Sequence, residues 1–423
     1  MRRGWVYVVV GLLWIGISVD AVRAQKLLIP MDLKQADHLK AYGAAYWVLE
    51  RGMDVEWLLN YRGGSFLTEA SEAIAREARI RGVTYEIVSG TDVAQIYSQM
   101  ERENMEVVKL EKAPTIAVYV PPTAQPWDDA VRLALEYADI PYTTLWDREV
   151  LEGRLGEYDW LHLHHEDFTG QYGKFYASYH NAPWYIQQQA RFEANARSLG
   201  FTKVSEEKKA VARKIREYVL NGGFLFAMCS ATDTIDIALA AENTDIAAAI
   251  YDGDPADPDA QQKLDFSKAF AFENFHIVTN PLEYEFSDID VQPQGGWGRG
   301  AKADYFTLFE FSAKYDPVPT MLTQDHTPVV NGFLGQTTAF HKRFIKKSVV
   351  IMGQVEGTDE VKYIHGNLGK GTFTFYGGHD PEDYQHRVGD PPTQLSLHKN
   401  SPGYRLILNN ILFPAAEKRK LKT

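Results

Sequence analysis

Short apolar runs alternate with amphipathic stretches through the first half of the chain. In the segment 37–51, apolar and tyrosine positions recur at helical spacing, and Gly52 marks the end. Thr68 stands before another helical pattern that runs to about residue 81. Apolar runs of strand length fall at 26–30, 55–59, 84–88, 115–120, 142–146 and 160–163. This alternation predicts an α/β fold, with a doubly wound and mostly parallel sheet between layers of helices.

The same pattern predicts how the chain is divided. We expect an N-terminal α/β lobe at 25–112 and a main α/β domain at 113–415, followed by a basic tail at 416–423. Two segments interrupt the main domain. An aromatic insertion occupies 166–203, and a β-rich insertion with long loops occupies 250–350, which we place near the active face.

Two local signals mark the last part of the main domain. Apolar runs at 361–365 and 372–376 flank a short glycine-containing turn, which predicts a hairpin. Ser401 and Pro402 then provide the start of a final helix that runs through residue 412.

The first residues have the pattern of a signal peptide. Two arginines precede an apolar run at 5–18, and small residues lie at the cleavage positions before Gln25. The run is shorter than a membrane-spanning helix requires. We therefore expect residues 1–24 to be removed, the mature protein to be periplasmic or secreted, and no stable membrane anchor to remain.

Charge and cysteine content narrow the classes of partner. The formal net charge of −12 argues against a nucleic-acid partner, which requires a basic face. A single cysteine allows no internal disulfide, so stability must come from the core. Aromatic residues make up 13% of the chain, which suits either a well-packed enzyme or a glycan-binding surface. The partners we expect are a small molecule, a glycan or a peptide.

The single cysteine, Cys229, lies at a predicted junction between a strand and a helix. The apolar run 224–228 follows two glycines, and a helix pattern opens near Asp233. The positive end of that helix favours a thiolate over a thiol. Several hydrolase folds present a nucleophile on such a turn, with backbone N–H groups nearby for an oxyanion. The alternative is that Cys229 is a small buried apolar residue.

A cysteine nucleophile needs a base, and the base needs an orienting group. His379 follows the last predicted strand, and open α/β sheets bind ligands at the carboxyl ends of their strands. Glu382 is three residues further on and can turn back upon the imidazole. Asp380 and Asp383 compete with Glu382 for that role.

The order of helix, Gly-Gly, strand, cysteine turn, and a distant Gly-Gly-His followed by Pro-Glu resembles the class I glutamine amidotransferase-like fold. The resemblance covers roughly residues 113–415 and is strongest with the trehalose-utilisation type. Family members hydrolyse amides with Cys, His and Glu, so the resemblance implies these roles for Cys229, His379 and Glu382. The turn reads Ala-Met-Cys-Ser-Ala here, where the family has Gly-x-Cys-x-Gly.

The full chain also resembles exported bacterial proteins described as asparagine synthetase B-like. The segment 229–234, Cys-Ser-Ala-Thr-Asp-Thr, is similar to the pyrophosphate loop of ATP-dependent amide-forming synthetases. It is shorter and lacks the glycines that let backbone approach a phosphate. An ATP-dependent amide ligase is therefore the weakest of the functions that we consider.

A second group of polar residues follows the strand at 160–163. His164 and His165 stand beside Glu166 and Asp167, where a parallel strand opens on the ligand-binding edge. A metal site needs three or four converging side chains, and adjacent histidines usually point apart. We therefore expect these four residues to contact substrate, with structural hydrogen bonding as the alternative, and we predict neither a metal nor a cofactor.

These observations predict an exported hydrolase that acts on an amide or ester. Cys229 attacks the carbonyl, His379 moves the proton, and Glu382 orients His379. The N–H group of Ser230 helps to hold the oxyanion, and Asp380 lies close to the substrate. The alternative is a non-catalytic protein of the same fold that binds a sugar or peptide.

Overall fold

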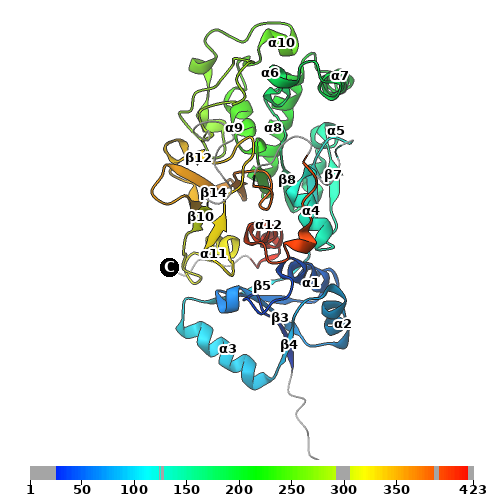
Figure 1. Cartoon of the computed structure of the whole chain (residues 1–423), viewed down its shortest axis with the longest axis vertical. Helices are drawn as coiled ribbons and strands as arrows, with labels where there is room; N and C mark the ends of the chain where they lie inside the picture. Colours follow the sequence, from blue (N-terminus) through cyan, green and yellow to red (C-terminus); the bar gives the residue numbers. More distant parts are fainter. Residues whose placement is uncertain (1–24, 123, 125–127, 292–304, 385–389, 418–423) are drawn as a thin grey trace, which may run out of the picture.

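The computed structural model describes residues 25–122, 124, 128–291, 305–384 and 390–417. The predicted signal peptide, residues 292–304 of the second insertion and the end of the basic tail lie outside the described residues. Two sheets, A and B, lie on either side of a layer of helices that includes α1 and α12 (Figure 1). Among the described residues, no helix is long and apolar enough to cross a membrane.

Sheet A is antiparallel and belongs entirely to the N-terminal lobe. Its strands lie in the order β4 (Glu86–Val88), β1 (Lys26–Ile29), β3 (Ser65–Glu69), β2 (Val55–Leu59) and β5 (Glu106–Leu110). The prediction of parallel pairing is wrong for this lobe. After β2 the chain reverses through Asn60, Arg62 and two glycines, all with positive φ, so β3 returns beside β2 in the opposite direction.

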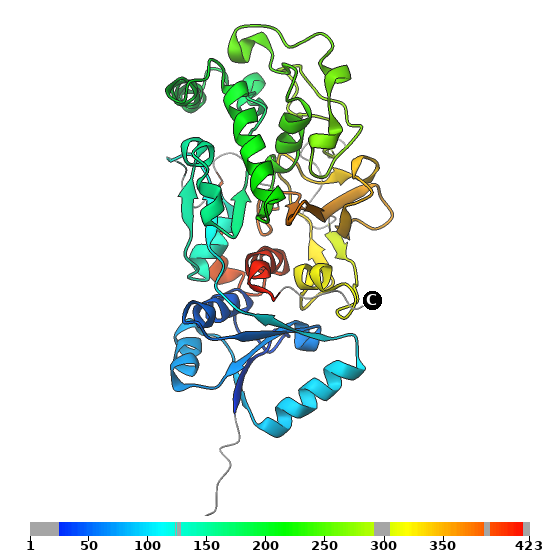
Figure 2. The same ribbon diagram turned by 180° about the vertical axis from the view of Figure 1, so that it is seen from behind.

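The helices of this lobe cover both faces of sheet A. Helices α1 (His38–Glu50) and α2 (Glu72–Arg81) pack on the face toward sheet B, and α3 (Gly90–Arg102) packs on the outer face (Figure 2). Thr68 does not cap α2, contrary to the sequence prediction, because it belongs to β3. Ser71 is the N-cap instead, and its Oγ accepts a hydrogen bond from the N–H of Ile74 at 3.2 Å.

Sheet B combines a parallel half and an antiparallel half. The parallel strands are β15 (Gly371–Tyr376), β9 (Phe224–Met228), β8 (Trp160–Leu163), β6 (Ile116–Tyr119) and β7 (Thr143–Leu145), in that order. The antiparallel strands are β14 (Glu360–Leu368), β13 (Val350–Gln354), β10 (Tyr305–Leu308) and β11 (Val329–Asn331), with β12 (Phe340–His341) beside β14. The predicted hairpin is confirmed as β14 and β15, and the fold is mixed α/β.

Helices pack on both faces of the parallel half. On one face lie α5 (Asp147–Leu151), α8 (Val204–Leu220) and α9 (Ala231–Ala240), which share a core with Leu225 and Ala227 of β9. On the other lie α4 (Ala130–Tyr137) and α12 (Pro402–Leu412), which share a core with Phe224 and Phe226. Alternate side chains of β9 therefore point to opposite faces of sheet B and pack in both cores.

The two insertions extend the edges of this body. The first contains α6 (Tyr176–Tyr179) and α7 (Pro183–Ser198), and is helical at its end. The second contains α10 (Ala249–Asp252), α11 (Pro317–Thr323) and the strands β10 to β12, which add to sheet B.

Arg405 of α12 ties the N-terminal lobe to the rest of the chain. Its side chain is fully buried and donates hydrogen bonds to Tyr42 Oη at 2.9 Å, to Met31 O at 3.1 Å and to Gly63 O. It also lies 3.9 Å from the buried Asp325 carboxylate. The lobe at 26–110 is thus anchored to the main body by a buried charge with hydrogen-bonded partners.

We predict that Arg405→Met lowers the free energy of unfolding by about 3–5 kcal/mol, because it removes the buried cation near Asp325 and leaves the buried acceptors on Tyr42, Met31 and Gly63 without their donor. Urea unfolding monitored by tryptophan fluorescence measures the change. Arg343→Met, at a side chain that is 57% exposed, is the control and should change little. A loss below about 1 kcal/mol for Arg405→Met would contradict the anchoring role.

Candidate functional site

The site forms where the parallel strands of sheet B end. Leu163 of β8 pairs with Ala227 of β9, and Met228 pairs with Tyr376 of β15. The residues that follow these strands are therefore neighbours. We call the positions just after the carboxyl ends of β6, β8, β9 and β15 the rim. Sequence reasoning placed candidate residues after β8, β9 and β15, and the structure brings those three strand ends together.

Cys229 lies on the turn between β9 and α9, as predicted. Its φ of 51° is in the left-handed region, which costs a non-glycine residue of the order of 1–3 kcal/mol. Backbone hydrogen bonds hold the turn on both sides. The N–H of Cys229 donates to Gly378 O at 3.1 Å, and the N–H of Ala231 donates to His164 O at 3.1 Å. The surrounding strands thus impose a strained conformation on Cys229.

The sulfur of Cys229 is surrounded by backbone N–H groups. The N–H of Gln336 lies 3.3 Å from Sγ, and the N–H groups of Ser230 and Thr337 also face it. Burial raises the pKa of the Cys229 thiol to about 11, although these N–H groups act in the opposite direction. The expectation that the start of α9 favours a thiolate is therefore wrong for the site without substrate, where Cys229 is a neutral thiol.

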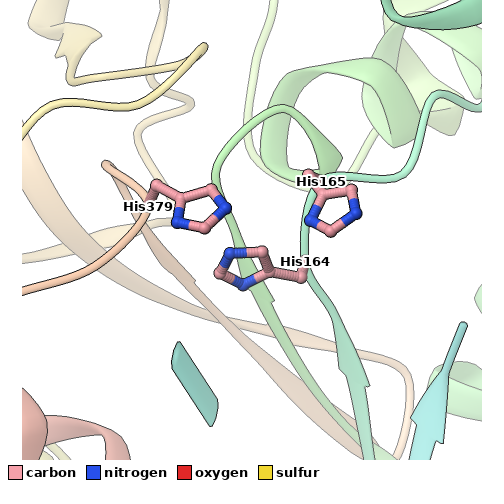
Figure 3. A group of neighbouring side chains, drawn as sticks. All are labelled: His164, His165 and His379. Carbon is pink, nitrogen blue, oxygen red and sulfur yellow. The ribbon is translucent and has the colours of Figure 1, made fainter. Parts of the chain in front are cut away.

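Three imidazoles converge beside this turn. One ring nitrogen from each of His164, His165 and His379 lies within 4.8 Å of the other two (Figure 3). The rings of His164 and His379 are perpendicular, with centroids 4.3 Å apart, and His165 stacks on His379 at 5.9 Å. The expectation that adjacent histidines point apart is wrong here. His164 and His165 come after the last residue of β8, where the alternation of a strand no longer applies.

Asp129 lies behind the imidazoles at the N-cap of α4. Its Oδ1 accepts hydrogen bonds from His162 Nε2 at 3.2 Å and from the N–H of Val131 at 2.8 Å, and it lies 3.7 Å from His164 Nδ1. Burial raises the pKa of Asp129, but His162 and the N–H of Arg132 outweigh that effect and hold it below its usual range. Sequence reasoning missed Asp129, although its position before a helical pattern was a capping signal.

Glu166 and Asp167 differ in their surroundings. Glu166 is 6% exposed, and burial raises its pKa to about 7. The carboxylate of Asp167 accepts hydrogen bonds from Thr169 and from the N–H of Gly173, so it shapes the loop that follows β8. Both residues also line a pocket with His165, Tyr172, Phe175 and Gln188. The pocket places the aromatic insertion next to the rim.

The acids after His379 have partners of their own. The Asp380 carboxylate accepts a hydrogen bond from the N–H of Glu382 at 2.9 Å, and burial raises the pKa of Asp380 above its usual range. Glu382 Oε2 lies 2.9 Å from His398 Nδ1, a pair that the sequence did not indicate. The orientation of His379 by Glu382 stays a prediction.

Gln336 is a second residue that sequence reasoning missed. It belongs to the segment between β11 and β12, and its backbone N–H faces the sulfur while its side chain donates to Gly173 O at 2.6 Å. Nothing local in the sequence marks this position, because the contact joins residues 107 positions apart. The second insertion therefore reaches the rim, as expected.

Comparisons with known proteins identify no family. No protein-family model matches the chain, and no curated protein matches it. Among solved structures, the cytoplasmic protein STM3548 of Salmonella typhimurium is 10% identical, with a TM-score of 0.33, covering 72% of this chain and 100% of its own. The cytoplasmic protein STM1381 of the same species is 12% identical, with a TM-score of 0.34 and the same coverage. At these TM-scores the similarities carry no argument about fold or function.

We predict that the native protein reacts slowly with iodoacetamide at pH 7, because a pKa of about 11 leaves only about 1 thiol in 10,000 ionised. The rate should rise up to about pH 11. Peptide mass spectrometry measures the rate at Cys229, the one cysteine of the chain, separately from alkylation of lysines at high pH. In urea the thiol should react with an apparent pKa of about 8.5. An apparent pKa of 7 or below in the native protein would overturn this description of the sulfur.

Proposed function

We propose that this protein is an exported hydrolase that cleaves an amide or ester at the rim, with Cys229 as the nucleophile. The observation that carries the proposal is the strained turn at Cys229, whose φ is 51°. Strain of this kind persists only where the surrounding structure imposes it, and it concentrates at functional sites. Hydrolases of several folds present a nucleophile on a turn of this type.

A neutral thiol requires proton removal during the attack. Because burial keeps Cys229 protonated, the base must take the proton as the sulfur approaches the carbonyl carbon. His379 is the proposed base. It follows Gly378, and the carbonyl of Gly378 accepts a hydrogen bond from the N–H of Cys229. The backbone just before His379 is therefore tied to the turn. The proton then passes from His379 to the leaving amine or alcohol as the C–N or C–O bond breaks.

The backbone N–H groups at the sulfur supply the second requirement. The developing oxyanion needs donors that already point at its position. The N–H groups of Gln336 and Ser230 point at Sγ and would be close to an oxyanion that forms on the attacked carbonyl. Water then attacks the resulting thioester and gives a proton to His379, and as the C–S bond breaks His379 returns that proton to the Cys229 sulfur. We place the substrate entrance at the pocket beside His165 and Tyr172, whose volume of about 70 Å³ admits water or one end of a substrate.

A second candidate is a non-catalytic protein that binds a sugar or peptide in the same pocket. The high pKa of Cys229 and the pairing of Glu382 with His398 favour it. An ATP-dependent amide ligase has less support. Asp233 accepts a hydrogen bond from Thr337 Oγ1, and Thr234 Oγ1 donates to Glu166 O, so both side chains are used inside the protein. They do not form an open phosphate loop.

We predict that Cys229→Ala lowers kcat/KM on an aryl ester or aryl amide by at least about 1,000-fold, because it removes the nucleophile. His379→Gln should cause a loss of similar size, and the double variant should be little worse than either single variant, since the two residues act as a unit. Hydrolysis is measured by release of the chromophore.

His276→Gln is the control, since its side chain is 72% exposed and pairs with Asp288. It should retain full activity. Hydrolysis that survives in Cys229→Ala would refute the thiol mechanism. Saturable binding of an oligosaccharide or peptide without turnover by the native protein would establish the second candidate in its place.

A further inference from the structure

The three imidazoles at the rim come from two different strand ends. His164 and His165 follow β8, and His379 follows β15 (Figure 3). Strand β9, which leads into the Cys229 turn, pairs with both of these strands. One ring nitrogen from each lies within 4.8 Å of the others. Nitrogen ligands bind Zn²⁺ at about 2.0–2.1 Å, so two of them on a tetrahedral ion are about 3.4 Å apart. Small side-chain rotations are enough to reach that arrangement.

The carboxylate of Asp129 is a separate observation that points to a cation. Asp129 is 2% exposed, and its Oδ2 has no hydrogen-bond partner within the part of the chain that the structure describes. Its Oδ1 lies 3.7 Å from Nδ1 of His164. Histidines that bind a metal almost always have a carboxylate, carbonyl or water at the other ring nitrogen, which fixes the ring and raises its basicity. Asp129 stands in that position behind His164.

The surroundings of the cluster favour positive charge and leave an entrance. His165 Nε2 lies 4.0 Å from the Asp128 carboxylate, and Glu166 and Asp167 line the adjoining pocket. His164 and His379 are almost wholly buried, whereas the side chain of His165 is 35% exposed. A cation held by the three rings would therefore have one side toward the pocket, where water or a substrate oxygen can bind.

A cluster of three aspartates elsewhere differs from the histidine cluster in already having a cation among its side chains. Asp245, Asp252 and Asp254 also lie close together, but the Nζ atom of Lys203 sits among them, 2.7 Å from Asp245 and 3.3 Å from Asp252. The ammonium group already supplies the positive charge there. Within the described residues, the charged side chain paired with His165 is the Asp128 carboxylate, not a lysine or arginine.

We propose that His164, His165 and His379 bind one divalent transition-metal ion of the Zn²⁺ class, with Asp129 as the carboxylate behind His164 and the fourth position open to the pocket. Three imidazoles suit Zn²⁺, Co²⁺, Ni²⁺ or Cu²⁺ and suit Ca²⁺ or Mg²⁺ poorly. This site goes beyond the proposed function, because it gives His379 another role. An imidazole that binds a cation has no lone pair for the Cys229 proton, so the metal and the thiol chemistry compete for His379.

The test is a titration of the purified, chelator-stripped protein with Zn²⁺ and with Co²⁺, read by calorimetry and by visible absorption. We expect one equivalent to bind, with the absorption bands of tetrahedral or five-coordinate Co²⁺. His165→Ala should weaken binding by more than the roughly 10–100-fold that loss of an outer-shell partner costs. Asp129→Asn should weaken it within that 10–100-fold range.

Two controls separate this site from others. His276→Ala, at an exposed histidine, should leave the affinity unchanged, and circular dichroism checks that His165→Ala and Asp129→Asn remain folded. Cys229→Ser should also bind normally, because Cys229 does not belong to the group of close ligand atoms. Absence of stoichiometric binding, or binding that both His165→Ala and His164→Ala leave intact, would overturn the proposal.

Hydrolysis assays distinguish failure of this site from failure of the proposed function. We expect Zn²⁺ to slow the Cys229-dependent hydrolysis at the same concentrations at which it binds, and His165→Ala to relieve that inhibition. Activity that rises with Zn²⁺ and survives Cys229→Ala would keep the metal site and refute the thiol mechanism. Inhibition by Zn²⁺ that persists unchanged in His165→Ala would place the inhibitory ion elsewhere and count against the site.

Discussion

Parallel pairing of β8, β9 and β15 is the constraint on which the rest of this structure depends. The pairing fixes the register of Leu163, Ala227, Met228 and Tyr376, and so decides which residues follow the strands side by side. Two hydrogen bonds then tie the Cys229 turn to the neighbouring chain ends, at Gly378 and at His164. The strained and buried Cys229 and the three imidazoles lie close together because the strand pairing fixes where their backbones leave the sheet.

Burial sets the electrostatics of this rim. It raises the pKa of Cys229 to about 11 and that of Glu166 to about 7, and it keeps Asp129 next to partners that stabilise its charge. Groups in such surroundings interact more strongly than they would in water. A base that acts in step with nucleophilic attack fits a neutral thiol, and a cation fits the carboxylate behind the imidazoles. Proton transfer and metal binding both depend on these buried polar groups. His379 cannot serve as the base for Cys229 and as a metal ligand at the same time.

Much of the main body follows from local sequence signals. The apolar run 224–228 between a glycine pair and a helix pattern predicted the Cys229 turn, and Ser401-Pro402 predicted the start of α12. Sheet A could not be predicted in the same way, because alternating strands and helices occur with parallel and antiparallel pairing alike. The feature that decides the pairing is the chain reversal at Asn60 and the glycines after it. Thr68 resembles a helix cap in the sequence, but it belongs to β3, a strand that the apolar pattern did not reveal. Asp129, Gln336 and the convergence of His164 with His165 depend on contacts between distant segments, which no local pattern contains.

The most direct test of the thiol mechanism is rapid-quench mass spectrometry of the protein mixed with an activated ester. The account predicts a transient mass increase equal to the acyl group, located on the peptide that contains Cys229, and a longer-lived adduct in His379→Gln. Turnover of the ester with no acylated Cys229 at any time would contradict the account.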